Sequence, residues 1–73
     1  MTVVFLFHTS SAAFRAEKAL KEARAAARLI PTPRQFSSDC GIALSVDEAD
    51  IDAARAALNE AGVEYAALHR MEP

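Results

Sequence analysis

The residues most able to do chemistry lie near the middle of the chain, in Pro31–Gly41, which reads Pro-Thr-Pro-Arg-Gln-Phe-Ser-Ser-Asp-Cys-Gly. This stretch holds the only cysteine of the sequence, Cys40. A thiol becomes a strong nucleophile when it ionises, and nearby cations or the N–H groups at the start of a helix favour the thiolate. With no Cys-x-x-Cys pair, neither a dithiol redox centre nor a zinc site is predicted, and no cofactor or metal is expected.

Other residues of this stretch suit an anionic sulfur atom. Arg34 would supply a fixed positive charge from the loop itself. Gly41 would let the backbone adopt a positive φ or approach the sulfur closely. Ser37 and Ser38 offer hydroxyl groups to a polar ligand. These four residues are therefore candidate neighbours of a reactive Cys40.

A second group of candidates lies near the N-terminus. His8 is followed by Thr9, Ser10 and Ser11, whose side-chain oxygens are well suited to cap a helix. The unpaired N–H groups of Ser10, Ser11 and Ala12 at the start of that helix would then be able to hold an anion. An imidazole at His8 would be able to move a proton near neutral pH.

Each candidate also has an ordinary structural explanation. A lone cysteine is often a small buried hydrophobic residue, and the serines of the loop are common turn formers. His8 would then only end a strand, and Arg34 would be a solvated surface residue. His69, near the end of the chain, is expected to be an edge-strand residue far from the loop.

The elements that must position these residues follow from the apolar pattern. Runs of β-branched and aromatic residues predict strands, and alanine-rich segments with apolar residues every three or four positions predict helices. The expected elements are a strand at Thr2–Phe7, a helix at Ala12–Ala26, strands at Arg28–Ile30 and Ile42–Val46, a helix between Asp47 and Gly62, and a strand at Val63–Arg70. This β-α-β-β-α-β order is typical of the ferredoxin-like α+β fold, with a four-stranded antiparallel sheet in the order 4-1-3-2 and both helices on one face.

The helix boundaries differ in how strongly the sequence marks them. Asp47 is a good N-cap for the second helix, and Gly62 suits the left-handed residue that ends it. After the first helix, Arg24–Ala27 stands where a glycine turn is expected, so the sequence does not mark its end.

The expected topology decides which candidates meet. The first and third strands are neighbours and run in opposite directions, so the end of one lies beside the start of the other. Cys40, just before the third strand, is therefore expected beside His8 and the start of the first helix. A thiol, an imidazole and a set of helical N–H donors would converge at one end of the sheet.

Composition limits the remaining choices. The 73 residues predict a single domain over 1–73, with a core thin enough that a homodimer is compatible with it. The chain is 52% hydrophobic and 25% charged, with a formal charge of −2 and no basic run, so neither nucleic acid nor a membrane is an expected partner. A single cysteine is compatible with a reducing compartment, and we expect a cytoplasmic location.

Several short motifs resemble those of one known family. They are Phe7 and Ser10, Ala16-Glu17-Lys18 with Leu20-Lys21, Leu29-Ile30-Pro31-Thr32-Pro33-Arg34, Ser37-Ser38, and Cys40-Gly41 leading into Ala43-Leu44. With them the chain resembles, over nearly its whole length, a family of small bacterial domains described as selenium/sulfur carrier protein-like. The resemblance implies that Cys40 carries sulfur or selenium as a persulfide or selenosulfide, and that donor and acceptor proteins are its partners.

Three hypotheses of function remain open from the sequence. The first is a sulfur or selenium carrier that works with partner enzymes rather than as an autonomous catalyst. The second is a non-catalytic module of ferredoxin-like fold that binds a small molecule or a protein and has a structural cysteine. The third, a small cysteine hydrolase, has the least support because no catalytic triad can be assembled around Cys40.

Overall fold

The computed structural model describes residues 1–36 and 41–71 of the chain. Its elements are β1 (Thr2–Leu6), α1 (Ser10–Glu22), β2 (Ala27–Pro31), β3 (Ile42–Asp47), the short 3-10 helix η1 (Glu48–Asp50), α2 (Ile51–Ala61) and β4 (Ala67–Met71). The α+β class, with four antiparallel strands and two helices in a β-α-β-β-α-β order, is confirmed.

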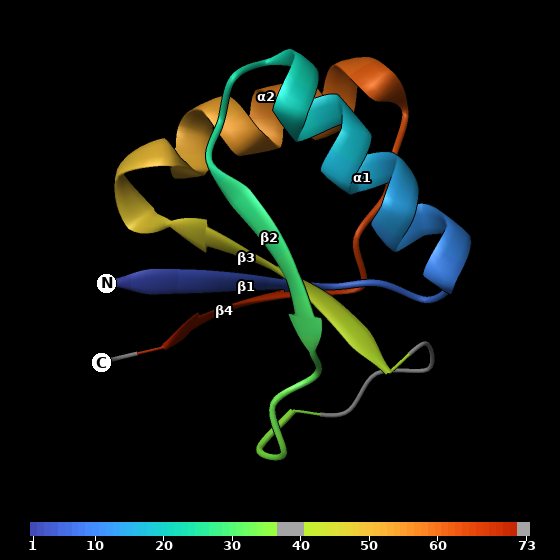
Figure 1. Cartoon of the computed structure of the whole chain (residues 1–73), viewed down its shortest axis with the longest axis vertical. Coiled ribbons are helices and arrows are strands. Elements are labelled where there is room, and N and C mark those ends of the chain that lie inside the picture. Colours follow the sequence, from blue (N-terminus) through green and yellow to red (C-terminus); the bar gives the residue numbers. More distant parts are fainter. Residues whose placement is uncertain (37–40, 72–73) are drawn as a thin grey trace.

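The sheet has the order β2-β3-β1-β4, and read from the β4 edge this is 4-1-3-2. Every neighbouring pair is antiparallel, with Leu6 opposite Ala43 on one side and opposite Ala67 on the other. Both helices lie on one face of the sheet, and the start of β1 lies beside the end of β4 at one end of it (Figure 1). The β1–α1 turn, the β2–β3 loop and the start of β4 therefore share the opposite end.

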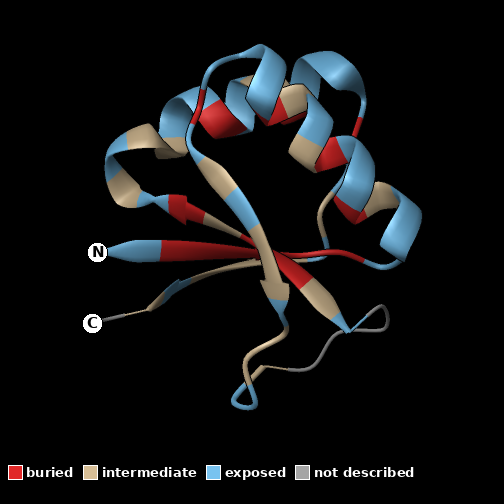
Figure 2. Cartoon of the chain, in the orientation of Figure 1, coloured by how far each residue is buried: buried red, intermediate tan, exposed pale blue. Residues whose placement is uncertain are grey.

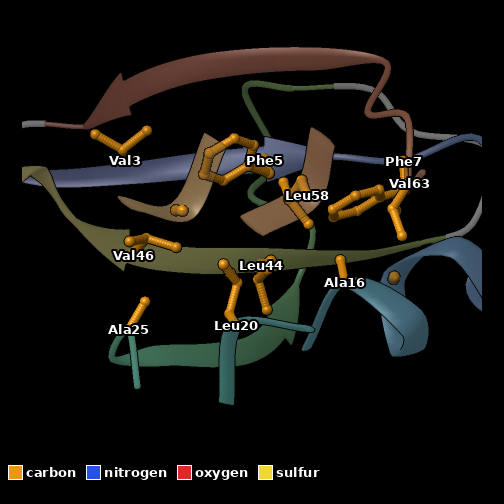
Figure 3. Close-up of a cluster of buried hydrophobic side chains, with 12 residues drawn as sticks. Val3, Phe5, Phe7, Ala16, Leu20, Ala25, Leu44, Val46, Leu58 and Val63 are labelled. Atoms are coloured by element: carbon orange, nitrogen blue, oxygen red, sulfur yellow. The ribbon is translucent and has the colours of Figure 1, made fainter. Parts of the chain in front are cut away.

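The main core fills the space between the sheet and the helices (Figure 3). Val3 and Phe5 of β1 and Phe7, directly after the strand, point into it and are completely buried. The helices contribute Leu20 and Leu58, which are also buried, while the outer sides of both helices are exposed (Figure 2). This alternation explains the continuous apolar run of β1, because its other side chains must be covered as well.

A second, smaller cluster covers the face of the sheet that has no helix. Its buried members are Val4, Leu6 and Ala43, and the partly buried residues packed against them are Ile30, Phe36, Ala67 and Met71. Phe36 comes from the loop after β2, so this loop folds back beneath the sheet. The central strand β1 is consequently buried on both faces.

The bounds of β1, β2 and β3 differ from those expected by one residue at one end or both, and those of one helix and one strand differ by more. The first helix is Ser10–Glu22 rather than Ala12–Ala26, because Arg24 turns the chain with a φ of 60°. The last strand starts at Ala67 rather than Val63. The N–H of Val63 bonds to the carbonyl of Leu58 and closes α2, so the chain joins the sheet only after this turn.

The start and end of the second helical segment follow the sequence closely. The Asp47 carboxylate accepts a hydrogen bond of 3.1 Å from the N–H of Ala49 and caps η1, which leads directly into α2. Gly62 ends α2 with a φ of 71°. The left-handed Gly62 is confirmed. Asp47 caps η1 rather than α2 itself, whose own N-cap residue, Asp50, makes no capping hydrogen bond through its side chain.

Candidate functional site

The candidate site begins at the turn that joins β1 to α1. His8 lies two residues beyond β1 and is exposed. Thr9 is the N-cap of α1, and its Oγ1 accepts a hydrogen bond of 3.1 Å from the N–H of Ala12. The expectation that the N–H of Ala12 would be available to an anion is therefore wrong, because the Thr9 side chain already satisfies it.

Two backbone donors remain at this helix end. Ser10 and Ser11 are exposed, and the N–H groups of both precede the first intrahelical hydrogen bond, which runs from Ala13 to the carbonyl of Thr9. The first turn of α1 contains no acidic residue that would oppose an anion there. This end of α1 can therefore still offer two N–H groups to a negatively charged atom.

The β2–β3 loop is closed by a backbone hydrogen bond. The N–H of Thr32 donates to the carbonyl of Gly41 at 3.1 Å, which extends the pairing of β2 and β3 by one residue. Gly41 is exposed and has a φ of 72°, the left-handed conformation that favours glycine. Cys40, Ser37 and Ser38 lie outside the described residues.

Gly41 lies at the same end of the sheet as His8. The last paired residues of β1 and β3 are Leu6 and Ala43, and His8 and Gly41 each lie two positions beyond this pair. Because the two strands are adjacent and antiparallel, the β1–α1 turn and the residue that follows Cys40 meet at one edge. The structure thus brings His8, Ser10, Ser11 and Gly41 to one end of the molecule.

Arg34 lies on a different side. It is exposed in the turn that the hydrogen bond from the N–H of Phe36 to the carbonyl of Pro33 closes at 3.0 Å. This turn extends away from the helices, and Phe36 packs on the sheet face opposite to them (Figure 1). The described residues therefore do not place Arg34 next to the start of α1.

One contact of the loop was missed from the sequence. The rings of Phe36 and His69 are stacked, with centroids 4.2 Å apart and planes within 9° of parallel. The expectation that His69 would lie far from the loop is wrong. Phe36 lies across the face of the sheet without helices, between the apolar side chains of the second cluster and His69 of β4.

The described residues also limit other kinds of site. Within residues 1–36 and 41–71, no three His, Cys, Asp or Glu side chains are grouped closely enough to hold a metal ion. No helix among them is long and apolar enough to cross a membrane.

The comparison with known proteins adds one finding to this geometry. The family described as "Putative Se/S carrier protein-like" matches residues 2–70 of the chain. The chain matches no curated protein and no solved structure. The family match covers both helices, the whole segment from Pro31 to Gly41 and all four strands except Met71, the last residue of β4.

Proposed function

This chain belongs to the Se/S carrier protein-like family, and we propose that it carries sulfur or selenium on Cys40. The observation that carries the proposal is the family match, which covers the single cysteine of the chain together with its loop. In this proposal Cys40 accepts one chalcogen atom from a donor protein, holds it as a persulfide or selenosulfide, and passes it to an acceptor protein.

The transfer needs no external oxidant or reductant. The thiolate of Cys40 attacks the terminal sulfur of a persulfide on the donor, and a new bond forms between Sγ and that sulfur. The donor's S–S bond breaks at the same time, and the donor sulfur leaves with the electron pair as a thiolate. Delivery repeats the step in reverse, with an acceptor thiolate attacking the terminal sulfur and Cys40 leaving as a thiolate. Selenium is transferred by the same two steps, with a selenium atom in place of the terminal sulfur.

Geometry near the loop supports roles for the surrounding residues. We propose that the N–H groups of Ser10 and Ser11 stabilise the anionic terminal atom, and that His8 gives and takes the proton of the attacking or leaving sulfur. Gly41, directly after Cys40, has the positive φ that lets the backbone turn sharply beside the sulfur.

The remaining candidates belong to the loop itself. Arg34 would add positive charge from the same loop, and Ser37 and Ser38 would donate hydroxyl hydrogen bonds to the carried atom. Such a protein exchanges its cargo with partner proteins, so it needs an accessible loop rather than a deep pocket. We propose a reducing cytoplasm as its place of work, with or without pairing to a second copy.

Persulfide loading tests the proposal directly. The reduced chain is incubated with a cysteine desulfurase and cysteine, and its intact mass is measured without added reductant. We expect a mass increase of one sulfur atom, which dithiothreitol removes. Because Cys40 is the only cysteine, any such adduct on a thiol can be assigned to it without peptide mapping. Selenocysteine in place of cysteine, with a matching lyase, measures selenium loading.

The control is Cys40→Ser, which must stay unmodified under the same conditions. A second control shows that the desulfurase itself carries a persulfide during the incubation. If the native chain then stays unmodified, the carrier proposal is wrong, and a binding module with a structural cysteine becomes the better explanation.

A further inference from the structure

A polar cleft lies at the end of the sheet where His8 lies. The residues that line it are distant in sequence from the loop between β2 and β3. It consists of two adjoining hollows of about 560 and 440 Å³, both open to solvent. Both hollows are lined by His8, Asn59, Val63 and Glu64. Two regions far apart in sequence therefore form one cleft, namely the β1–α1 turn and the continuous stretch from the last turns of α2 to the segment before β4.

Two arginines flank this cleft from the two helices. Arg15 of α1 lines one hollow and Arg55 of α2 lines the other. Neither guanidinium has an ion-pair partner among the residues that the structure describes, whereas Lys21 lies 3.9 Å from Glu17 and Arg70 lies 3.3 Å from Glu48. Two cations that form no ion pair within the described residues thus face one concave surface on a chain whose formal charge is −2.

The cleft also has uncharged hydrogen-bond donors and an apolar surface that is part of the core. Asn59 brings an amide and Tyr65 a phenol to its lining. The Tyr65 ring is held edge-to-face against Phe5, with centroids 4.9 Å apart, so its position is fixed by the core. Val63, which is 6% exposed, forms the apolar floor. Charged and neutral donors are therefore arranged around a rigid surface.

Glu64 sets the limit on what this cleft can bind. Glu64 lines both hollows, so the two arginines and the one glutamate of the lining have a summed formal charge of +1. A polyanion such as nucleic acid would need many cationic contacts, which this surface lacks. One small anion would instead satisfy the two guanidinium groups while it stays clear of Glu64.

We propose that this cleft binds a small tetrahedral oxyanion of the sulfate, phosphate or thiosulfate class. The fork of an arginine side chain matches two oxygens of such an anion, and charge-assisted hydrogen bonds of this kind are stronger than neutral ones. The proposal does not depend on sulfur transfer by Cys40, so it goes beyond the proposed function.

Titration of the full-length ¹⁵N-labelled chain tests the site. Sodium sulfate, phosphate and thiosulfate are added in separate experiments, with ionic strength held constant by sodium chloride. We expect saturable shifts of the backbone amides around the cleft and none in β2. Arg15→Gln and Arg55→Gln should each weaken binding about tenfold, because each removes one charge-assisted contact. Both side chains are exposed, so both variants are expected to fold, and their spectra show directly whether they do.

The matched control is Arg28→Gln, which removes the same charge from an exposed residue on the sheet face without helices. It should leave the affinity within about twofold, as expected for screened charges at a distance. Cys40→Ser should also bind normally, so failure of the carrier proposal and failure of this one are separate results.

Removal of the negative charge at Glu64 should affect the affinity for the anion in the opposite direction. Glu64→Gln should tighten binding about threefold or more, because it removes a charge that repels the anion. Glu60→Gln should change the affinity less, because Glu60 lines a different hollow, between the two helices. Shifts that grow linearly without saturation would overturn the proposal. So would an equal loss in Arg28→Gln, or weaker binding in Glu64→Gln, which would indicate that the ligand needs the carboxylate.

Discussion

At the scale of single residues, Arg24 holds a position that glycine usually fills. Both helices end in the same hydrogen-bond pattern, in which the N–H of Ala25 donates to the carbonyl of Leu20 and the N–H of Val63 to that of Leu58, each at 2.9 Å. The turn residue of α2 is Gly62, with a φ of 71°, whereas that of α1 is Arg24, with a φ of 60°. A side chain with a Cβ is strained in this left-handed conformation, so α1 ends at a local energetic cost.

Arg24→Gly should therefore stabilise the protein by about 0.5–1 kcal/mol, since it removes this strain at the cost of a more flexible unfolded chain. Arg24 is exposed, and no ion pair within the described part of the chain would be lost. Urea unfolding followed by circular dichroism measures the change.

The companion variant is Gly62→Ala, which should lose about 1 kcal/mol. A Cβ at Gly62 would meet nothing within 4 Å, so any loss there reports backbone strain alone. Destabilisation by Arg24→Gly would contradict the assignment of strain to this turn.

At the scale of elements, the β2–β3 loop is the part of the fold that the sequence described least well. Only its second limit was predicted correctly, because Gly41 permits a positive φ, whereas Pro31, expected beyond the strand, pairs with Ile42 as the last residue of β2. Its path was not predictable, because a strand pattern does not show which loop aromatic crosses the free face of a sheet. The unbroken apolar run of β1 indicates a strand covered on at least one face. That its second face is also covered, and by Phe36, could be found only from the three-dimensional structure.

Phe36 should hold this loop against the sheet. Phe36→Ala removes the cover over Val4, Leu6 and Ala43, and we expect a loss of about 2 kcal/mol, less than for a fully buried phenylalanine because Phe36 is half-buried. Urea unfolding measures the loss, and amide exchange should show faster exchange at Leu6 and Ala43.

Two further variants separate the causes. Phe36→Leu should keep most of the cover and lose only the ring stacking on His69, about 0.5–1 kcal/mol. Gln35→Ala, at an exposed neighbouring position, should change stability by less than about 0.5 kcal/mol. A Phe36→Ala variant as stable as Gln35→Ala would show that the loop does not depend on this contact.

At the scale of the whole molecule, the fold was predictable because the local patterns agree with one another. Strand runs, alanine-rich helices and caps such as Asp47 and Gly62 all indicate one β-α-β-β-α-β arrangement. That arrangement predicted Cys40 beside His8. Cys40 lies outside the described residues, and Gly41, which follows it, lies at the same end of the sheet as His8. The cleft beside them was not predictable, because it joins residues such as Arg15 and Arg55 that share no motif and meet only through helix packing.

The small size of the molecule predicts that its stability depends strongly on single buried side chains. A chain of 73 residues is expected to have a free energy of unfolding of about 4–11 kcal/mol, so one core side chain is a large share of it. Leu20→Ala, on the inner side of α1, should cost about 3 kcal/mol because Leu20 is fully buried between the helix and the sheet. Phe14→Ala removes a larger side chain from the same helix but should lower the free energy of unfolding by less than about 0.5 kcal/mol, because Phe14 is 56% exposed.

Urea unfolding of the two variants measures the difference in stability, provided that the free energy of unfolding falls equally steeply with urea concentration in both. Similar losses at Leu20 and Phe14 would show that the outer side of α1 is also covered in solution, for example by a second copy of the chain, and a dependence of the Phe14→Ala loss on protein concentration would identify that case.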